Sequence, residues 1–310
     1  METLEVIGKL PAREGRFDVR ELLAFGAIYF LWGATFLAIR VAVLEIPPFF
    51  TAGVRFSVAG ALLYFFMRLR GQPAPSAQQW RGIAVIAVCM FVVTYAAIFW
   101  AEQFVPSGIT AVLEATLPLI AMILEVFVFR RQPFRWRMLV AVTLGFGGIA
   151  LLLWTDTGRS FGLFPCLVIL AGSIAWTLGA VLTRSLSLPQ SVPLAAGAEM
   201  MLGGVVLLAL AFVTGEMHPF PHIPLRAAVA LLYLIVGGSL VAFTAYVWLL
   251  ARMPATRVAS HAYVNPLVAV ALGYFLGGEV VTPRMLFASL LVIASVFLIL
   301  KPASVTDGSK

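Results

Sequence analysis

Ten runs of apolar residues, each about long enough to cross a lipid bilayer as a helix, follow one another along this chain of 310 residues. Because the hydrocarbon core offers no water to backbone groups, each run must satisfy its own hydrogen bonds as a helix. The sequence is 62% hydrophobic and only 11% charged, which excludes a water-soluble fold. We therefore predict an all-α integral membrane protein with transmembrane helices at residues 22–41, 47–67, 81–101, 107–129, 135–154, 162–183, 191–213, 226–250, 256–277 and 284–300.

The basic residues are divided unevenly between the two sides of such a bundle. If the N-terminus is inside, 16 Lys and Arg fall in the segments on that side, and only Arg159, Arg226 and Arg284 fall in the opposite loops. Cytoplasmic loops of membrane proteins carry an excess of Lys and Arg, so we expect both termini in the cytoplasm. The net charge of +7 is then a topology signal, and no nucleic-acid partner is expected.

The two halves of the chain repeat one pattern. An odd number of helices in each repeat makes the second copy enter the membrane from the opposite side, which predicts two inverted five-helix halves. The expected segments are a cytoplasmic N-terminal segment 1–21, a first repeat 22–154, a linker 155–161, a second repeat 162–300 and a cytoplasmic tail 301–310. Shifts of 144 and 148 residues superpose Trp32 on Trp176, Arg40 on Arg184, Gly53 on Gly197, Gly60 on Gly204 and Pro118 on Pro266.

Several motifs taken together resemble the EamA branch of the drug/metabolite transporter superfamily over nearly the whole chain. They are FLWGATF, TAGVRF, LEATLPLIA, its echo HAYVNPLVA, and YFLGGEVVTPRMLFASLLVIASVFLIL. The resemblance implies a ten-helix carrier of the inner (plasma) membrane that exports small metabolites, with the YddG-like aromatic amino-acid exporters as one candidate subgroup. One position departs from the pattern, because Arg131 stands in the first half where Glu279 stands in the second.

Catalytic chemistry finds few parts in this sequence. It has no Walker loop, no H-E-x-x-H motif and no GxSxG motif, so we expect neither an enzyme nor a cofactor. His218 and His222 have the spacing of a helical metal pair, but Pro219, Pro221 and Pro224 make that stretch a loop. No metal site is therefore expected.

Polar and aromatic residues inside the spans are the candidates for a solute pathway. Ionisable residues within spans usually face the bundle interior or a water-filled cavity, although structural hydrogen bonding or core packing is the alternative for each of them. The candidate substrate contacts are Trp32, Tyr95, Glu114, Trp176, Tyr246, His261, Tyr263 and Asn265. The candidate structural or gating residues are Arg55, Pro118, Glu199 and Pro266.

Depth in the membrane suggests partners for the charged residues. At about 1.5 Å per helical residue, Arg55 and Glu114 lie at a similar distance from the outer face, and Glu199 and His261 at a similar distance from the inner face. A lone charge at such depth tends to find a partner, so we expect Arg55 to pair with Glu114 and Glu199 to contact His261. Pro118 and Pro266, at equivalent places of the two halves, are expected to bend their helices.

Together these patterns predict a secondary carrier that works by alternating access through a central cavity between the halves. Its partners would be the lipid bilayer and a small amphipathic solute, and the resemblance implies that aromatic or other hydrophobic amino acids are the preferred solutes. Multidrug or nucleotide-sugar transport is one alternative, and a non-transporting scaffold or lipid-handling protein is another. The sequence leaves the exact substrate, proton coupling and oligomeric state open.

Overall fold

The computed structural model describes residues 18–130, 134, 136–153, 162–183, 185–250, 252–253 and 258–300. Within these ranges the regular secondary structure is helical and contains no strand. The expected linker 155–161, the tail 301–310, most of the N-terminal segment and Arg131 lie outside the described residues.

Seven helical segments in the described part of the chain are long and apolar enough to cross a membrane. Their ends lie within four residues of the corresponding expected spans. They are Val19–Val43, Pro48–Leu69, Ala77–Ala101, Ser107–Val128, Leu163–Leu182, Val192–Val213 and Leu225–Leu250. Three shorter helices, α8 (Trp136–Leu153), α14 (His261–Phe275) and α15 (Pro283–Leu300), accompany them.

Several of these segments are divided into α-helical and π-helical pieces, the latter labelled η. The first consists of α1 (Val19–Gly26), η3 (Ala27–Leu31) and α2 (Trp32–Val43), and it is followed by α3 (Pro48–Leu69). Next come α4 (Ala77–Ile86), η4 (Ala87–Val93) and α5 (Thr94–Ala101), then α6 (Ser107–Glu114), α7 (Leu117–Ile123) and η5 (Leu124–Val128). After α8 follow α9 (Leu163–Leu182), α10 (Val192–Val213), α11 (Leu225–Tyr233), η6 (Leu234–Val241) and α12 (Ala242–Leu250).

The π-helical turns change how the backbone is satisfied. In such a turn the N–H bonds five residues back instead of four, which locally disturbs the ladder and often marks a functional site. A shift of 148 residues carries η4 (Ala87–Val93) onto residues 235–241, inside η6 (Leu234–Val241). The two turns therefore fall at corresponding places of the sequence repeat.

The two prolines expected to bend their helices have different effects. The fourth span is broken, because α6 ends at Glu114 and α7 begins at Leu117 with Pro118 as its second residue. Proline has no N–H to continue a helix but is tolerated in a first turn. Pro266 lies inside α14, which continues through it without a break. A break at the proline is thus found in the fourth span and not in α14.

The helices α3 and α10 pack with their backbones in close approach. A Cβ on Gly60 would overlap the backbone of Met201, and a Cβ on Gly204 would overlap the backbone of Ser57. Small residues allow this packing in membranes, where apolar burial alone does not drive helices together. Gly60 and Gly204 are also superposed by the shift of 144 residues, so the repeat places its glycines at a shared interface.

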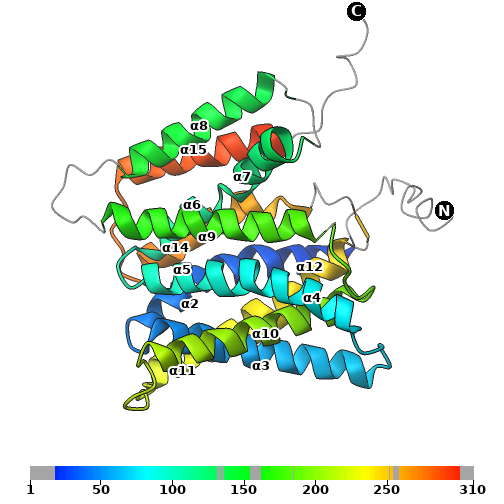
Figure 1. Ribbon diagram of the computed structural model, residues 1–310. Helices are drawn as coiled ribbons and strands as arrows, with labels where there is room; N and C mark the ends of the chain where they lie inside the picture. The colour runs from blue at the N-terminus through cyan, green and yellow to red at the C-terminus, as the bar shows by residue number, and fades with distance from the viewer. Residues whose placement is uncertain are drawn as a thin grey trace, which may run out of the picture.

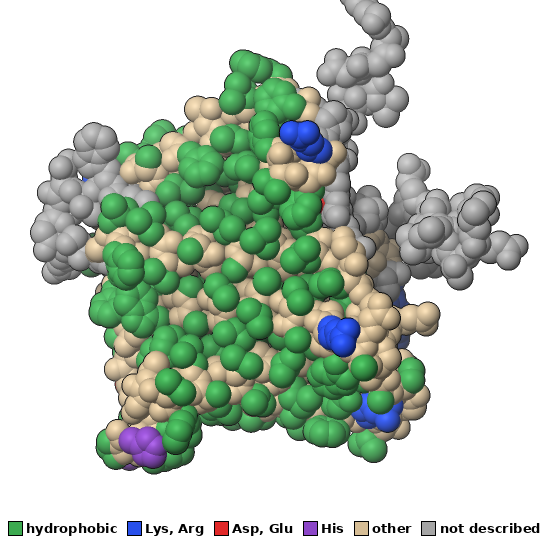
Figure 2. Space-filling view, in the orientation of Figure 1, with side chains coloured by type: hydrophobic (Ala, Val, Ile, Leu, Met, Phe, Trp, Pro, Cys, Tyr) green, Lys and Arg blue, Asp and Glu red, His purple; other side chains and the backbone are tan. Residues whose placement is uncertain are grey.

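The helices form stacked layers in Figure 1, with α8 and α15 at one edge of the bundle and α3, α10 and α11 at the other. Figure 2 shows a face dominated by hydrophobic side chains, on which the visible Lys and Arg lie toward the right-hand ends of the helices. Phe66 and Phe297 are 51% and 55% exposed. An apolar surface of this kind suits contact with lipid.

Candidate functional site

The π-helical turn η3 is held by side chains from two distant helices. The Tyr233 hydroxyl on α11 donates to the carbonyl of Leu31 at 2.8 Å. The Asn265 amide on α14, oriented with its nitrogen toward the carbonyls, donates to Ile28 and Tyr29 at 3.1 Å each. Because the membrane interior supplies no water to free carbonyls, these bonds stabilise the turn where it stands. Asn265 is therefore a link between helices.

Trp32, the first residue of α2, forms an aromatic group with two other candidate residues. Its ring centroid lies 5.2 Å from that of Tyr246 and 5.1 Å from that of His261, and the last two are 5.8 Å apart. The Trp32 indole N–H donates to the carbonyl of Gly238 in η6 at 2.9 Å. We call Trp32, Tyr246 and His261 the first aromatic cluster.

A second aromatic cluster consists of Phe56, Phe91, Tyr95 and Trp176. The Tyr95 ring centroid lies 4.4 Å from that of Phe56 and 6.0 Å from that of Trp176. Phe91 lies 6.2 Å from Trp176 and 5.3 Å from Phe56. The structure thus brings the candidates Tyr95 and Trp176 together from α5 and α9, and Trp32 and Trp176 belong to different clusters.

Arg55 on α3 contacts the second aromatic cluster and is linked to the first through η6. Its guanidinium carbon is 4.6 Å from the ring centroid of Phe56 and 5.3 Å from that of Tyr95, distances suited to cation–π attraction. Its Nε donates to the Ser239 hydroxyl in η6 at 3.0 Å. Ser239 directly follows Gly238, whose carbonyl binds Trp32, so η6 connects Arg55 to the first aromatic cluster.

Glu114 has a different partner from the one expected. The Ser173 hydroxyl on α9 donates to its Oε1 at 2.6 Å, and no ion pair joins the described residues Arg55 and Glu114. The predicted Arg55–Glu114 pair is therefore wrong. The reason is helix adjacency, because α3 packs on α10 and η6, whereas α6 packs on α9 and α14. Depth alone could not indicate which helices are neighbours.

The expected contact between Glu199 and His261 is also absent as a hydrogen bond or ion pair between these two described residues. The Nδ1 atom of His261 lies 3.0 Å from the Val258 carbonyl, to which it donates in the tautomer protonated at Nδ1. Glu199 is buried on α10, which packs on α3 and η4. The two side chains thus belong to different helix contacts.

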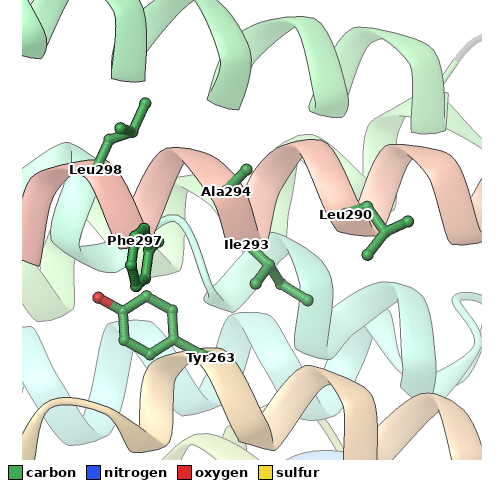
Figure 3. A pocket seen from close by; sticks show the side chains of 6 residues that line it. All are labelled: Tyr263, Leu290, Ile293, Ala294, Phe297 and Leu298. Carbon is green, nitrogen blue, oxygen red and sulfur yellow. The ribbon is translucent and has the colours of Figure 1, made fainter.

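Tyr263 points away from the other candidate contacts. Figure 3 shows its ring turned toward α15, beside Phe297, at an apolar recess that is also lined by Leu290, Ile293, Ala294 and Leu298. The Tyr263 hydroxyl donates to the carbonyl of Val296 at 3.3 Å. The structure therefore gives Tyr263 a place between α14 and α15, and not in either aromatic cluster.

Arg40 and Glu102 form a polar group just after the end of α5. Neither residue is among the candidates from the sequence. Arg40 donates to the carbonyls of Glu102 and Val105. The carboxyl group of Glu102, in the loop after α5, is fully buried. Burial raises its pKa well above the ordinary glutamate value, with Glu279 adding to the rise and Arg40 and Thr110 opposing it.

Two loop carboxylates bind the backbone at helix starts. Glu279 accepts hydrogen bonds from the N–H groups of Ser107 at 2.7 Å and Gly108 at 3.2 Å, at the start of α6. Glu216 accepts from the N–H of Phe50 at 2.9 Å, at the start of α3. A carboxylate at a helix N-terminus satisfies free N–H groups and is favoured by the helix dipole. These contacts tie loops of the second half to helices of the first.

Several polar contacts of the site could not be found in the sequence. Ser173 and Ser239 are ordinary hydroxyl residues within apolar spans, and Tyr233 lies seven residues after the basic residue Arg226. Only their partners, 59, 184 and 202 positions away in the chain, give them a role. In the part of the chain that the structure describes, His, Cys, Asp and Glu form no group of three that could hold a metal ion.

A family model described as the EamA-like transporter family matches the chain twice, at residues 20–154 and 163–301. The chain is 36% identical over 281 residues to the uncharacterized inner membrane transporter YedA of Escherichia coli (strain K12), covering 89% of each chain. A WAT1-related chloroplastic protein of Arabidopsis thaliana is 26% identical and is matched over 94% of this chain and 72% of its own length.

A solved crystal structure shares the fold at a TM-score of 0.62 with 19% sequence identity, over 90% of this chain and 97% of the other.

Proposed function

The chain belongs to the EamA-like transporter family, and from this membership we propose that it exports small amphipathic metabolites, with aromatic or other hydrophobic amino acids preferred. That it is a transporter of the inner membrane follows from the family and from its relative YedA. Secondary transporters commonly bind their solute near the bilayer midplane between two repeats. The proposal concerns the solute, the direction and the route.

The observation that carries the substrate class is the pair of aromatic clusters, one in contact with Arg55 and the other linked to it through η6. Aromatic rings supply a large apolar surface with preferred edge and face contacts for another ring. A buried cation beside them suits a solute that has an apolar body and one charged group. Neither a nucleotide sugar, with its two phosphates, nor a lipophilic cation fits this pairing as well.

The helix contacts support two inverted five-helix halves. Under the sequence repeat, α3 corresponds to α10 and α8 to α15, and each of these helices packs on its own counterpart. The helix α14 corresponds to the end of α6 together with α7, and it packs on α6. The contact of α5 with α9 likewise corresponds to the contacts of α12 with α1 and η3. Exchange of the halves would therefore preserve the main contacts, as a two-fold axis in the membrane plane requires. The double family match supports the same arrangement.

Both termini in the cytoplasm would agree with the gathering of visible Lys and Arg at one end of the helices (Figure 2). Alternating access would use the breaks in the helices as hinges. The fourth span is interrupted before Pro118, and carbonyls of η3 and η6 each accept a side-chain bond from another helix. Thr94, the residue after η4, donates to the carbonyl of Gly172 on α9. Hinge residues are a few positions that absorb backbone rotation while the rest moves as a body.

Solute flux into proteoliposomes tests the proposal. The panel consists of labelled phenylalanine, tryptophan, leucine, a nucleotide sugar and a lipophilic cation, with protein-free liposomes as background. Saturable uptake of the amino acids is the expected result. A preference for the nucleotide sugar or the lipophilic cation would show that the proposed substrate class is wrong. The absence of uptake of every solute would contradict the proposed carrier activity.

Variants at the clusters link the flux to the site. Trp32→Phe removes the indole N–H that binds the Gly238 carbonyl, and Trp176→Phe shortens the ring against Tyr95. Both variants should slow amino-acid uptake clearly while leaving the unfolding temperature close to that of the wild type. Trp100→Phe, which contacts Phe104 and Phe164 away from both clusters, is the matched control. Unchanged uptake in the first two variants would remove these residues from the route.

A further inference from the structure

Arg55 is a buried cation without an anionic partner. It is only 4% exposed, and no Asp or Glu among the described residues forms an ion pair with it within 4.0 Å. A buried charge that lacks a counter-ion is costly, and such charges normally pair or neutralise. Arginine stays protonated under nearly all conditions in proteins, so neutralisation is not available to it. The counter-ion must then come from elsewhere.

Two acids near Arg55 do not form an ion pair with it. Glu114 accepts from Ser173 on α9. Glu102 acts on Arg55 only from beyond ion-pair distance; Arg40 binds its backbone carbonyl, and its carboxyl oxygens have no hydrogen-bond partner among the described residues. Neither carboxyl group approaches the guanidinium within the ion-pair distance of 4.0 Å.

The guanidinium is nevertheless held in a defined orientation. Its Nε donates to Ser239, and its plane lies against Phe56 and Tyr95. Its Nη1 is buried and has no hydrogen-bond partner within the described part of the chain. An arginine presents its donors as a rigid fork that matches a carboxylate. The Nη1 group of Arg55 is therefore held in place without a hydrogen-bond acceptor among the described residues.

The backbone of Gly238 lies close against the guanidinium, at a position where only glycine fits. A Cβ on Gly238 would lie 3.3 Å from Nη2 of Arg55 and 2.7 Å from the Thr35 side chain, so a larger residue would crowd the guanidinium. The same glycine presents its carbonyl to Trp32. A group bound at the fork would therefore be next to the first aromatic cluster as well as the second.

We propose that Arg55 binds the carboxylate of the transported solute through Nη1, while the two aromatic clusters contact the apolar body. This inference rests on the proposed function and narrows it to anionic carboxylates and amino acids that have a free carboxyl group. The bound carboxylate serves as the counter-ion of Arg55, because no described Asp or Glu forms an ion pair with it. Ser239 is then a positioning residue, because its hydroxyl fixes the guanidinium without touching the solute.

Four labelled aromatic probes separate the contribution of the carboxylate. Phenylalanine and 3-phenylpropionate carry it, whereas phenylalaninamide and phenethylamine share the ring and lack it. Wild-type protein in proteoliposomes should take up the two acids at least about tenfold faster than the other two. A charge-assisted hydrogen bond contributes about 1.5–3 kcal/mol, which corresponds to about a ten- to hundredfold difference in affinity.

Arg55→Gln should abolish this preference by slowing uptake of the two acids about ten- to hundredfold, with less than a twofold effect on phenylalaninamide. Arg40→Gln is the matched control, because Arg40 is also a cation within a span but its guanidinium binds the carbonyls of Glu102 and Val105. It should keep the preference for acids. Ser239→Ala should raise the KM for the acids several-fold while leaving the amide unchanged.

A readout on the wild-type protein covers the case in which Arg55→Gln does not fold. 3-Phenylpropionate should raise the unfolding temperature of the wild type in detergent, and phenethylamine should not. Arg55→Lys, which keeps the charge but loses the fork, should show a smaller rise. Equal shifts by acid and amine would overturn the role of Arg55.

The remaining outcomes distinguish the two proposals. Equal uptake of acids and amide by the wild type, or a preference for acids that persists in Arg55→Gln, leaves the carrier intact and overturns the role of Arg55. Uptake of none of the four probes overturns both the substrate class and the carboxylate site.

Discussion

The carboxylate of Glu279 occupies the space that a side chain on Gly273 would fill. From this position it accepts hydrogen bonds from the first N–H groups of α6, so the loop after α14 is joined to the start of the fourth span. Gly273 belongs to the GxxxG sequence that ends at Gly277. The absence of a side chain at Gly273 leaves space for the Glu279 carboxylate and also allows close helix packing.

Replacement of Glu279 should loosen this junction. Glu279→Gln keeps the shape but loses the charge at the N-terminus of α6, and we expect the free energy of unfolding to fall by about 1–2 kcal/mol. Chemical denaturation in detergent measures it. Glu45→Gln, an exposed glutamate at the end of α2, should be nearly neutral. Equal stability of Glu279→Gln and wild type would mean that the cap contributes nothing.

Glu216 should make stability depend on pH. Burial raises the pKa of Glu216 above its ordinary 4.5, against the opposing hydrogen bonds from Phe50 and Phe49. A raised pKa means that the folded protein holds this proton more tightly than the unfolded chain. The contribution to stability is therefore full below pH 4.5 and is lost as the pH rises through the folded-state pKa.

The measurement is the unfolding temperature as a function of pH, compared with Glu216→Gln, which cannot titrate. The variant should show a flatter profile above pH 4.5. Identical profiles of the variant and the wild type would show that Glu216 does not contribute to the dependence.

Asn265→Leu should destabilise the first helix. The change keeps a similar shape but removes the amide that binds the carbonyls of Ile28 and Tyr29. The Tyr29 carbonyl keeps the Trp32 backbone N–H as a donor, and each hydrogen bond lost with the amide costs about 0.5–1.5 kcal/mol. Hydrogen exchange at η3 should rise together with the loss of stability. Leu267→Ala, on the same helix at a side chain that is 51% exposed, is the control and should leave exchange at η3 unchanged.

Gly204→Ala should separate α3 from α10. Its Cβ would overlap the backbone of Ser57, and backbone cannot move aside as a flexible side chain can. We expect a loss of several kcal/mol or failure to fold, measured by thermal unfolding and yield. Gly147→Ala is matched, because no atom lies within 4 Å of the added Cβ and alanine favours helix. A tolerated Gly204→Ala would show that the two helices are less closely packed.

Labelling tests the membrane orientation. Thr214, an exposed residue in the loop after α10, should lie outside the cell if both termini are cytoplasmic. In a background with Cys89 and Cys166 replaced by alanine, Thr214→Cys should react with an impermeant maleimide in intact cells. Reaction only after the inner face is opened would reverse the topology.

Hydrophobicity and helix breakers act locally, so the helical spans could be located before the folded arrangement was known. The expected span 47–67 corresponds to α3 at Pro48–Leu69, and the break before Pro118 follows from a missing N–H. The shift of 144 residues identifies Gly60 and Gly204 as a repeated pair in the sequence. Close packing of α3 and α10 requires glycine at both positions. These features depend on residues within one or two turns of each other, or on a regular repeat.

The partners of the buried polar groups depend on which helices are neighbours, and that was decided by tertiary packing. Arg55 binds Ser239 because α3 lies against η6, and Glu114 binds Ser173 because α6 lies against α9. Equal depth in the membrane suggested that Arg55 and Glu114 are partners. Depth alone does not determine which helices are neighbours, and a contact also depends on the position within the membrane plane. Tyr263 likewise turned toward α15 because rotation about the helix axis is set by packing across helices, which local composition does not determine.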